Sequence, residues 1–493
     1  MRVLLVYSNQ TRDLLPAPPI GLSYVASAAQ RAGHAVHFLD LLISAHPLDD
    51  LRDAVRRIQP QVIGFSVRNI DNVVYQRLAR HLDVLGEMIA SVRQVSNARV
   101  VLGGPAISVL GPAALQHLNA DFAVIGEGEV TFPLLLRAIE ERIDYSRLEG
   151  VCYRRDGKIY STPMAHLPEF AASGMQQWID WPAYERRGGT WALQTKRGCP
   201  LHCNYCTYPA VEGRNLRRRS PQAVADEIEQ VMATVGPRTI EFVDSTFNVP
   251  ERHAIAICQE IIRRKLKVNL TAMGVNPLNT SEELFTLMKR AGFNSMMITP
   301  EAANDRMLRH LQKGFSMEHV RRTAQLARKS GIRSIWFFML GGPGETRDTV
   351  EETLSFVERE LGWNGCLSIF MTGIRILPGT DLARSAIAEG YLKPDADLAQ
   401  PAFYFSPQVS EHWMLNRINR AVATHPNIVH AAEEGGSTFE RLFNRALHFL
   451  GVAPPYWRFL STFLRIPPLP LLRRRYPSVG KSHKARSTQN SCD

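Results

Sequence analysis

The chain has 493 residues and a formal net charge of +11, with 45% hydrophobic and 21% charged residues. This composition is typical of a globular protein and excludes a disordered or fibrous chain as the main state. At roughly 100–200 residues per domain, the length suggests two to four domains. No run of about 18 uncharged apolar residues occurs, so we expect no membrane-spanning helix.

Charge and cysteine content bear on partners and on compartment. Residues 456–493 hold eight basic residues against Asp493 alone, so this tail carries +7 of the net charge. The chain has seven cysteines, of which three cluster and four are scattered. An odd, uneven set does not fit a secreted disulfide framework, and we therefore expect a reducing, cytoplasmic compartment.

Residues 1–140 alternate short apolar runs with helical patterns. The strand candidates are Val3–Tyr7, Ala35–Leu39, Val62–Ser66, Arg99–Leu102 and Phe122–Ile125, and the helical patterns between them include Gly21–Ala32, Leu48–Ile58 and Tyr75–Val92. This alternation predicts an α/β fold with a doubly wound parallel sheet that is covered on both faces.

The ends of these strands are rich in glycine and polar residues. In parallel sheets, ligands bind at the carboxyl ends of the strands, and glycine lets the backbone approach a ligand closely. None of these turns matches a Gly-x-Gly-x-x-Gly dinucleotide fingerprint, and taken alone they read as ordinary turns. The candidate contacts are Ser66, Arg68, Gly103, Gly104, Pro105, Gly126, Glu127, Gly128 and Glu129.

Three further regions follow. Residues 141–190 form a hairpin and linker, in which Asp156-Gly157 is a hairpin signal. Residues 191–390 contain six further βα units, which predict a partial barrel because a full eightfold barrel typically needs about 250 residues. Residues 391–493 form a mostly helical C-terminal region with a basic, aromatic tail. The strand candidates of the barrel are Ala192–Lys196, Thr239–Val243, Val268–Ala272, Ser295–Thr299, Ser334–Leu340 and Leu367–Ile376.

The strongest chemical signal is a run of three cysteines with the spacing Cys-x3-Cys-x2-Cys. Cys199, Cys203 and Cys206 follow the first strand of the barrel region, and three such thiolates can bind three irons of a [4Fe–4S] cluster. A structural zinc site would need a fourth ligand. His202 has the right chemistry, but it is adjacent to Cys203 in the chain and is poorly placed to join the same tetrahedron.

This cysteine run, with Tyr205 before its last cysteine, resembles the signature of the radical S-adenosylmethionine (SAM) enzymes. The resemblance covers roughly residues 191–390 and implies that Tyr205 is a SAM-binding residue, that Asp244 contacts the SAM amino group and that Glu301 contacts the ribose. Many members have Gly-x-Glu-Ser-Gly where this chain has Thr299-Pro300-Glu301-Ala302-Ala303, so we expect the local backbone to differ. Singly, each residue also fits a structural role.

Residues 1–140 resemble the cobalamin-binding domain found upstream of one large radical SAM class. Many cobalamin proteins carry Asp-x-His-x-x-Gly, but none of the fifteen histidines here has an aspartate two residues before it. The resemblance therefore implies cobalamin bound without a histidine from that motif, at the strand-end residues named above. A degenerate, empty domain is the alternative.

The resemblance implies a cobalamin-dependent radical SAM enzyme, most simply one that methylates an unactivated carbon of a small-molecule or lipid-like substrate. The alternatives are a cobalamin-dependent cyclase, oxidase or rearrangement enzyme and, from another class, a non-catalytic cobalamin or iron–sulfur sensor. An electron donor such as flavodoxin or ferredoxin is implied as a partner. Nucleic acid is not favoured, because no aromatic-interleaved motif accompanies the charge.

Two basic segments remain open in function. Arg214, Arg217, Arg218 and Arg219 follow the cysteines; they read as a solvated helix start, and one of them is a candidate for the SAM carboxylate. The C-terminal tail places aromatic residues beside arginines, which suits peripheral contact with an anionic membrane surface. Packing of its apolar residues on the barrel is the competing interpretation.

Overall fold

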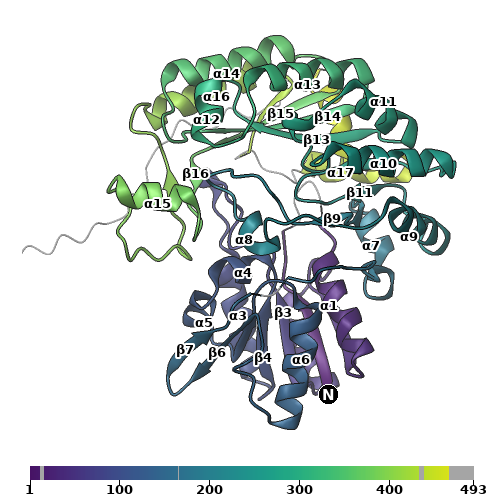
Figure 1. Ribbon diagram of the computed structural model, residues 1–493, viewed down its shortest axis with the longest axis vertical. Helices are drawn as coiled ribbons and strands as arrows, with labels where there is room; N and C mark the ends of the chain where they lie inside the picture. The colour runs from purple at the N-terminus through teal and green to yellow at the C-terminus, as the bar shows by residue number, and fades with distance from the viewer. Residues whose placement is uncertain (12–15, 165, 432–437, 466–493) are drawn as a thin grey trace, which may run out of the picture.

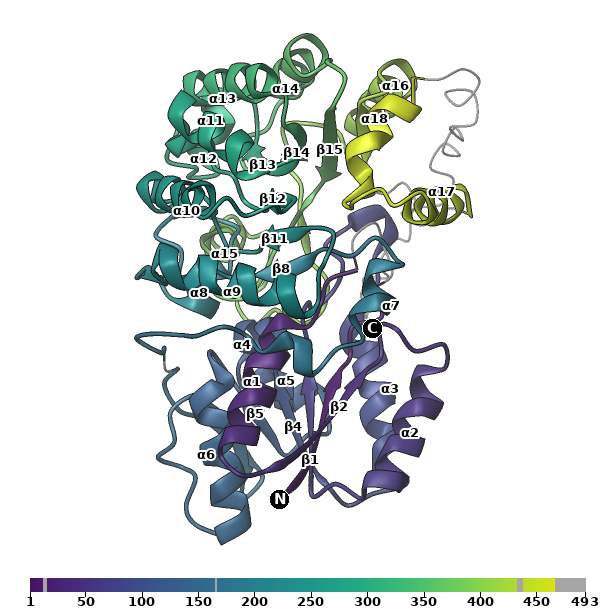
Figure 2. The same cartoon turned by 90° about the vertical axis from the view of Figure 1, so that its right-hand side faces the viewer.

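The computed structural model describes residues 1–11, 16–164, 166–431 and 438–465. Two α/β bodies lie one above the other, with the N-terminal body at the bottom of Figure 1 and the larger C-terminal body at the top. Figure 2 shows the same stacking from the side, with the loops that join the two bodies between them.

The N-terminal body is built on a seven-stranded sheet with the order β2-β1-β3-β4-β5-β6-β7. The first five strands pair in parallel, and the last two are antiparallel. The strands are β1 (Arg2–Tyr7), β2 (Ala35–Asp40), β3 (Val62–Ser66), β4 (Arg99–Gly103), β5 (Phe122–Val124), β6 (Val151–Arg155) and β7 (Lys158–Ser161). The predicted parallel sheet is confirmed.

Helices cover both faces of this sheet, which explains why its strands read as continuous apolar runs. Helices α1 and α6 pack on one face and α2, α3, α4 and α5 on the other, and alternate residues of β1 enter the two cores. The helices are α1 (Ile20–Arg31), α2 (Pro47–Ile58), α3 (His81–Arg93), α4 (Pro105–Leu110), α5 (Ala113–His117) and α6 (Gly128–Glu141).

Two details differ from the sequence expectation. The single helical pattern at 75–92 is split into a 3-10 turn η1 (Tyr75–Arg77) and α3, because the Asn72 side chain bonds Arg77 O and Ala79 N and holds the chain between them in a turn. The hairpin, expected in a linker, completes the first sheet by pairing β6 with β5. Its turn is the predicted Asp156-Gly157, with positive φ at both residues.

The C-terminal body contains the predicted partial barrel. Its strands run in the order β8, β11, β12, β13, β14, β15, β18, with parallel bridges that join β12 to β13. The strands are β8 (Trp191–Leu193), β11 (Ile240–Phe242), β12 (Leu270–Ala272), β13 (Ser295–Glu301), β14 (Arg333–Leu340), β15 (Cys366–Thr372) and β18 (Ile428–His430). Two short pairs, β9 (Lys196–Arg197) with β10 (Arg217–Arg218) and β16 (Ile374–Arg375) with β17 (Phe403–Tyr404), lie outside it.

A helix follows most barrel strands and covers the outside of the barrel (Figure 1). The predicted start of α9 is confirmed, because Ser220 accepts a hydrogen bond from Ala223 N and Pro221 is the first helical residue. The long helices are α9 (Pro221–Thr234), α10 (Glu251–Arg263), α11 (Glu282–Ala291), α13 (Met317–Ser330), α14 (Arg347–Glu360) and α16 (Glu411–Thr424). The shorter helical segments are α7 (Trp181–Glu185), α8 (Tyr208–Glu212), α12 (Asp305–His310), α15 (Asp381–Ala388), α17 (Thr438–Phe449), α18 (Leu460–Phe463), η2 (Met175–Gln177), η3 (Pro277–Asn279) and η4 (Tyr456–Phe459).

The described part of the C-terminal segment closes one end of the barrel. Trp457 is 4% exposed and packs on the interior residues Met297, Ile335 and Leu367, and Arg333 donates to Arg458 O at 2.6 Å. For this part of the tail, packing on the barrel is therefore the correct interpretation. Residues 466–493, which hold most of the predicted basic tail, lie outside the described residues.

Candidate active site

A cavity of about 350 Å³ lies between the two bodies. One wall is formed by the carboxyl ends of β3 and β4, the loop after β5 and the start of α1, and the opposite wall by β8, β11 and α8. Such a cavity falls within the roughly 300–1,000 Å³ typical of small-molecule sites. All nine predicted cobalamin-contacting residues line it: Ser66, Arg68, Gly103, Gly104, Pro105, Gly126, Glu127, Gly128 and Glu129.

Glycines at the ends of the strands leave only backbone at their own positions on this wall of the cavity. Gly104 has a φ of +98°, and a Cβ there would lie 2.7 Å from Val67 O, so no other residue fits without strain. A Cβ on Gly103 would meet only Val124 O, at 4.0 Å, which means that the missing side chain leaves open space at the end of β4. This backbone cradle fits a large, flat cofactor.

The polar groups of the cavity also fit a ligand. The hydroxyl of Tyr24 and Oε1 of Glu241 are buried without a hydrogen-bond partner among the described residues, and an unmet buried polar atom ordinarily has a ligand or water as its partner. Arg68 lines the cavity with an exposed side chain and makes no hydrogen bond or ion pair with the described residues. No histidine is present among the described residues that line the cavity, which agrees with the missing Asp-x-His pair.

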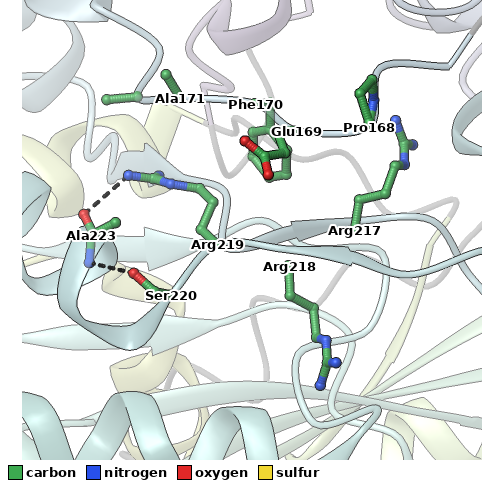
Figure 3. A pocket seen from close by; sticks show the side chains of 10 residues that line it. Pro168, Glu169, Phe170, Ala171, Arg217, Arg218, Arg219, Ser220 and Ala223 are labelled. Carbon is green, nitrogen blue, oxygen red and sulfur yellow. Dashed lines mark hydrogen bonds between the residues drawn. The ribbon is translucent and has the colours of Figure 1, made fainter.

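Most arginines of the run after the cysteines contact other residues of the chain. Arg219 is 8% exposed, pairs with Glu227 and donates to Ala223 O at 3.1 Å. Arg214 donates to Leu201 O at 3.1 Å. Figure 3 shows Arg217, Arg218 and Arg219 beside the loop at 168–171, around a second cavity of about 380 Å³. Arg218 is exposed as expected, but it belongs to the strand β10 and not to a helix start, and the guanidinium of Arg219 has buried partners.

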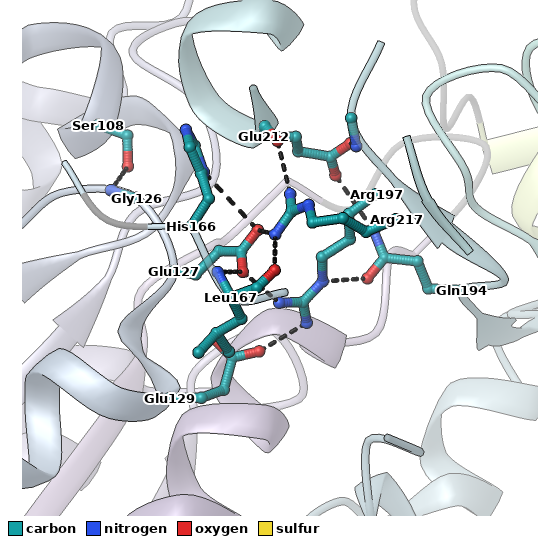
Figure 4. A network of polar contacts seen from close by, with 11 residues as sticks. Ser108, Gly126, Glu127, Glu129, His166, Leu167, Gln194, Arg197, Glu212 and Arg217 are labelled. Carbon is teal, nitrogen blue, oxygen red and sulfur yellow. Dashed lines mark hydrogen bonds and ion pairs between the residues drawn. The ribbon is translucent and has the colours of Figure 1, made fainter. Parts of the chain in front are cut away.

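Glu127 and Glu129 belong to a network that joins the two bodies (Figure 4). Arg197, which is only 5% exposed, contacts Glu127 at 3.2 Å and Glu129 at 2.6 Å, and Arg217 contacts Glu127 at 2.5 Å. The guanidinium of Arg197 also lies 4.4 Å from the ring centroid of Phe170. Both carboxylates line the cavity, and arginines of the second body compensate their charges, so they also help to attach the two bodies to each other.

The three predicted cluster cysteines lie in one loop beside this network. Gly198, with a φ of +93°, begins the loop, and a Cβ there would lie 2.2 Å from Asn215 O. Cys199 N donates to Gly213 O at 3.0 Å, which folds the loop back on itself. Burial and, to a smaller extent, the neighbouring Cys203 and Cys199 raise the pKa of Cys206 to about 12. The fold therefore brings the three cysteines into one loop, from which each can supply one thiolate to a cluster.

The other described cysteines lie outside this loop, whereas His202 belongs to it. Cys152, Cys258 and Cys366 are buried free thiols, and Cys492 lies outside the described residues. His202 is exposed and contacts Arg214 at 3.2 Å. Among the described residues, no group of three or more histidine, cysteine or acidic side chains gathers around a point that would hold a single ion. A cluster that takes one thiolate per iron fits the cysteine loop better than a zinc site does.

Two of the three predicted SAM contacts lie next to the cysteines. Tyr205 and Glu301 meet at Lys313, whose Nζ donates to Tyr205 Oη at 3.0 Å and lies 4.0 Å from Glu301 Oε1. Burial raises the pKa of Glu301, against the opposing effects of Lys313 and Tyr205. Glu301 has a φ of +68° at a bulge of β13, so the local backbone is indeed unusual here. Sequence reasoning missed Lys313, which follows Glu301 by twelve residues in the chain.

Asp244 makes several contacts within the chain. Its carboxylate is fully buried and accepts four hydrogen bonds: from Thr195 N at 2.7 Å, Thr195 Oγ1 at 2.6 Å, Lys196 N at 3.2 Å and Lys196 Nζ at 2.9 Å. A carboxylate offers about four acceptor positions, and all are filled. Asp244 therefore fixes the chain before the cysteine loop, and its contact with the SAM amino group stays a prediction.

Comparisons with known proteins agree with this layout. Residues 14–136 match the B12 binding domain and residues 193–357 match the radical SAM superfamily. The chain is a radical SAM protein with a B12-binding domain. This result confirms the predicted family and the predicted cofactors SAM and cobalamin, and a [4Fe–4S] cluster follows from membership of the family.

Relatives of this radical SAM protein include methyltransferases and cyclases. Tryptophan 2-C-methyltransferase from Streptomyces laurentii is 27% identical over 78% of this chain and 74% of its own length. Anaerobic magnesium-protoporphyrin IX monomethyl ester cyclase from Rubrivivax gelatinosus is 26% identical over 74% of this chain and 66% of its own length. The radical SAM methyltransferase TsrM from Kitasatospora setae, solved with cobalamin and a [4Fe–4S] cluster, shares the fold with a TM-score of 0.80 at 23% identity, over 94% of this chain and 98% of its own. The prediction of an enzyme is confirmed.

No helix within the described residues is long and apolar enough to cross a membrane.

Proposed function

We propose that this protein is a cobalamin-dependent methyltransferase that transfers a methyl group from SAM to an unactivated carbon of a small molecule. The observation that carries the proposal is the shared cavity: the strand ends of the B12-binding domain and the inner wall of the barrel face each other across it, with the cysteine loop attached to its side through Arg197. A substrate in this cavity would reach both halves of the enzyme.

When bound, the cluster and its two partner cofactors supply the electron, the radical and the methyl group, while the chain positions them and excludes water. Cys199, Cys203 and Cys206 would hold three irons. Tyr205 and Glu301, oriented by Lys313, would bind SAM beside the fourth. The end of β4 and the loop after β5 would cradle cobalamin with backbone groups, and Ser66 and Arg68 would contact its polar side chains.

A cobalamin-dependent cyclase, oxidase or rearrangement enzyme is the second candidate, and the relationship to the magnesium-protoporphyrin ester cyclases favours it. A non-catalytic sensor is disfavoured, because a protein that only bound cobalamin would not require the contacts among Tyr205, Lys313 and Glu301 beside the cysteines.

Product analysis separates these functions. The protein is reconstituted anaerobically with iron, sulfide and cobalamin, supplied with SAM and a reductant, and incubated with cell extract. Methyl transfer is expected to give S-adenosylhomocysteine together with 5′-deoxyadenosine. 5′-Deoxyadenosine alone would favour the second candidate, and neither product would favour a sensor. Omission of cobalamin and the Cys203→Ala variant serve as controls.

The same proposal includes a cytoplasmic location and a flavodoxin or ferredoxin as electron donor. Free buried thiols and an oxygen-sensitive cysteine loop both suit a reducing compartment. A low-potential one-electron donor is what a cluster that cleaves SAM requires. Reduction by purified flavodoxin under anaerobic conditions, followed in the visible spectrum, tests the second point.

Peripheral membrane contact is also part of the proposal. Helix α17 exposes Leu442 (60%) and Phe449 (89%), with Leu450 (72%) just after it, and the basic tail follows. Apolar side chains beside cationic residues suit an anionic bilayer surface, at about 1 kcal/mol per basic residue. Sedimentation with anionic vesicles at low and high salt, for the full chain and for a version ending at Arg465, measures the contact. This end point keeps the buried Trp457. Equal, negligible binding by both versions would remove the membrane interpretation.

A further inference from the structure

Glu241 occupies an unusual position in the inner wall of the barrel. It is the middle residue of β11, in register with Ala192 of β8 and Thr271 of β12, and lines the cavity between the bodies. Part of this wall is apolar, with Ala192 beside Glu241 and with Val243 and Met273 just after β11 and β12, whereas Gln194, Arg197 and Glu212 line the same wall. Glu241 therefore places a carboxylate beside an apolar part of the wall, opposite the strand ends of the B12-binding domain.

The carboxylate is buried but incompletely bonded. Glu241 is 7% exposed; one oxygen accepts a hydrogen bond from Thr190 Oγ1, and Oε1 is buried without a partner among the described residues. Burial raises the pKa of Glu241, against the opposing effects of the Thr190 hydrogen bond and the charge of Arg68. Leaving a buried acceptor unpaired is unfavourable, so this oxygen is suited to accept a hydrogen bond from a ligand.

Other buried glutamates of this chain do not share this feature. Glu227 pairs with Arg219, and Glu260 pairs with Arg263 and Arg264. Glu345, which like Glu241 makes no ion pair with the described residues, accepts hydrogen bonds at both oxygens, from Thr349 Oγ1 and Gly341 N. A glutamate that served only the core would be expected to be satisfied in one of these two ways. Glu241 has an oxygen that faces the cavity instead.

We propose that Glu241 is a substrate-orienting residue, whose Oε1 accepts a hydrogen bond from an N–H or O–H group of a substrate with an otherwise apolar body. This proposal rests on the proposed function, which it deepens by naming the substrate class. The apolar wall around Val243 and Met273 receives the body of the substrate, and Glu241 fixes which carbon faces the B12-binding domain. A compound of the same shape without the donor would leave Oε1 unpaired and bind less well.

The donor could also come from a cofactor, as the ammonium group of SAM or an amide of the corrin ring, and the experiment separates these sources. The reconstituted holoenzyme is compared with its Glu241→Gln and Glu241→Leu variants. Cobalamin and cluster content are read from the visible spectrum, SAM affinity is read by equilibrium dialysis, and the thermal midpoint reports folding. Glu345→Gln is the matched control, since it alters a buried glutamate outside the cavity.

Two small probes test the substrate class directly, without the natural substrate. Aniline and toluene have similar shapes and differ in the N–H donor, and their binding to the holoenzyme is measured by saturation-transfer NMR. We expect the wild type and Glu345→Gln to prefer aniline, and this preference to weaken in Glu241→Gln and to fall by roughly 10-fold or more in Glu241→Leu. Cofactor contents and SAM affinity are expected to stay within about twofold of wild type.

Each other outcome overturns the proposal. Loss of cobalamin or of SAM affinity in folded Glu241→Gln would assign the donor to that cofactor. No preference for aniline in the wild type, or the same preference in all variants, would make Glu241 a structural residue. The cofactor contents and the nucleoside products of the wild type test the proposed function separately. The proposal for Glu241 can therefore fail while the proposed function stands.

Discussion

Replacing Asp244 tests whether this residue supports the cysteine loop or contacts SAM. Asp244 and Lys196 have fully buried side chains 2.9 Å apart, and Lys196 Nζ also donates to Phe247 O at 2.8 Å. In Asp244→Ala the ammonium group of Lys196 would stay buried without a counter-charge. Removing one partner of a buried pair costs about 3–5 kcal/mol. For a domain of about 150–250 residues, 1 kcal/mol shifts the melting temperature by about 2–4 °C, so we expect a fall of roughly 6–20 °C.

The assay is thermal unfolding of the apoprotein followed by tryptophan fluorescence, since Trp191 is buried in β8, five residues before Lys196. Lys196→Met is expected to destabilise by a similar amount. In the double variant Lys196→Met, Asp244→Ala the two losses are expected to be less than additive, because the second change removes a charge that has already lost its counter-charge. The reasoning would be refuted if Asp244→Ala melted at the wild-type temperature and lost only its affinity for SAM. That result would favour the direct contact with the SAM amino group.

Three further predictions concern the cofactors and pH. Single changes of Cys199, Cys203 or Cys206 to alanine are expected to abolish the cluster, as measured by iron and sulfide content. Cys258→Ala alters a buried thiol elsewhere and should keep the cluster. Full iron and sulfide content in Cys203→Ala would contradict the assignment. Electron paramagnetic resonance of the cob(II)alamin form should show no splitting from an axial protein nitrogen, because no described residue lining the cavity is a histidine; clear splitting would disprove this. Burial raises the pKa of Glu345 from 4.5 to about 7, so the folded chain binds this proton more tightly than the unfolded chain. The stability that the bound proton contributes is present below pH 4.5 and is lost as the pH rises through about 7. Glu345→Gln should therefore reduce the fall in melting temperature over this range, and an unchanged pH profile would count against the assignment.

Most of the fold could be predicted from sequence, because its elements are marked by local signals. The strands at 62–66 and 99–103 read as continuous apolar runs since helices cover both of their faces, and the hairpin turn is specified by Asp156-Gly157. The pairing of β6 with β5 could not be predicted, because it brings together residues almost 30 positions apart in sequence and depends on the open edge of the sheet. The break after Arg77 depends on the side chain of Asn72, which is a tertiary detail.

The sequence predicted which strand-end residues line the cavity, but not the ion pairs and hydrogen bonds that they make. Strand-end reasoning identified residues that do line the cavity, yet it could not foresee that Glu127 and Glu129 meet Arg197 and Arg217 across the domain boundary. Motif position suggested a ligand contact for Asp244, but Lys196 reaches it from a neighbouring strand. Glu241 was not singled out, although a charged residue in the middle of the apolar strand Ile240–Phe242 was a usable signal.

The central claim, methyl transfer to carbon, is tested most directly by isotope transfer. The holoenzyme is incubated anaerobically with cell extract and with SAM that carries a trideuterated methyl group, and new products are sought by mass spectrometry. The account predicts a product that gains one methyl group with all three deuterons, that requires cobalamin and that is absent with Cys203→Ala. A new product formed with 5′-deoxyadenosine but without deuterium would contradict methyl transfer and favour cyclase or oxidase chemistry.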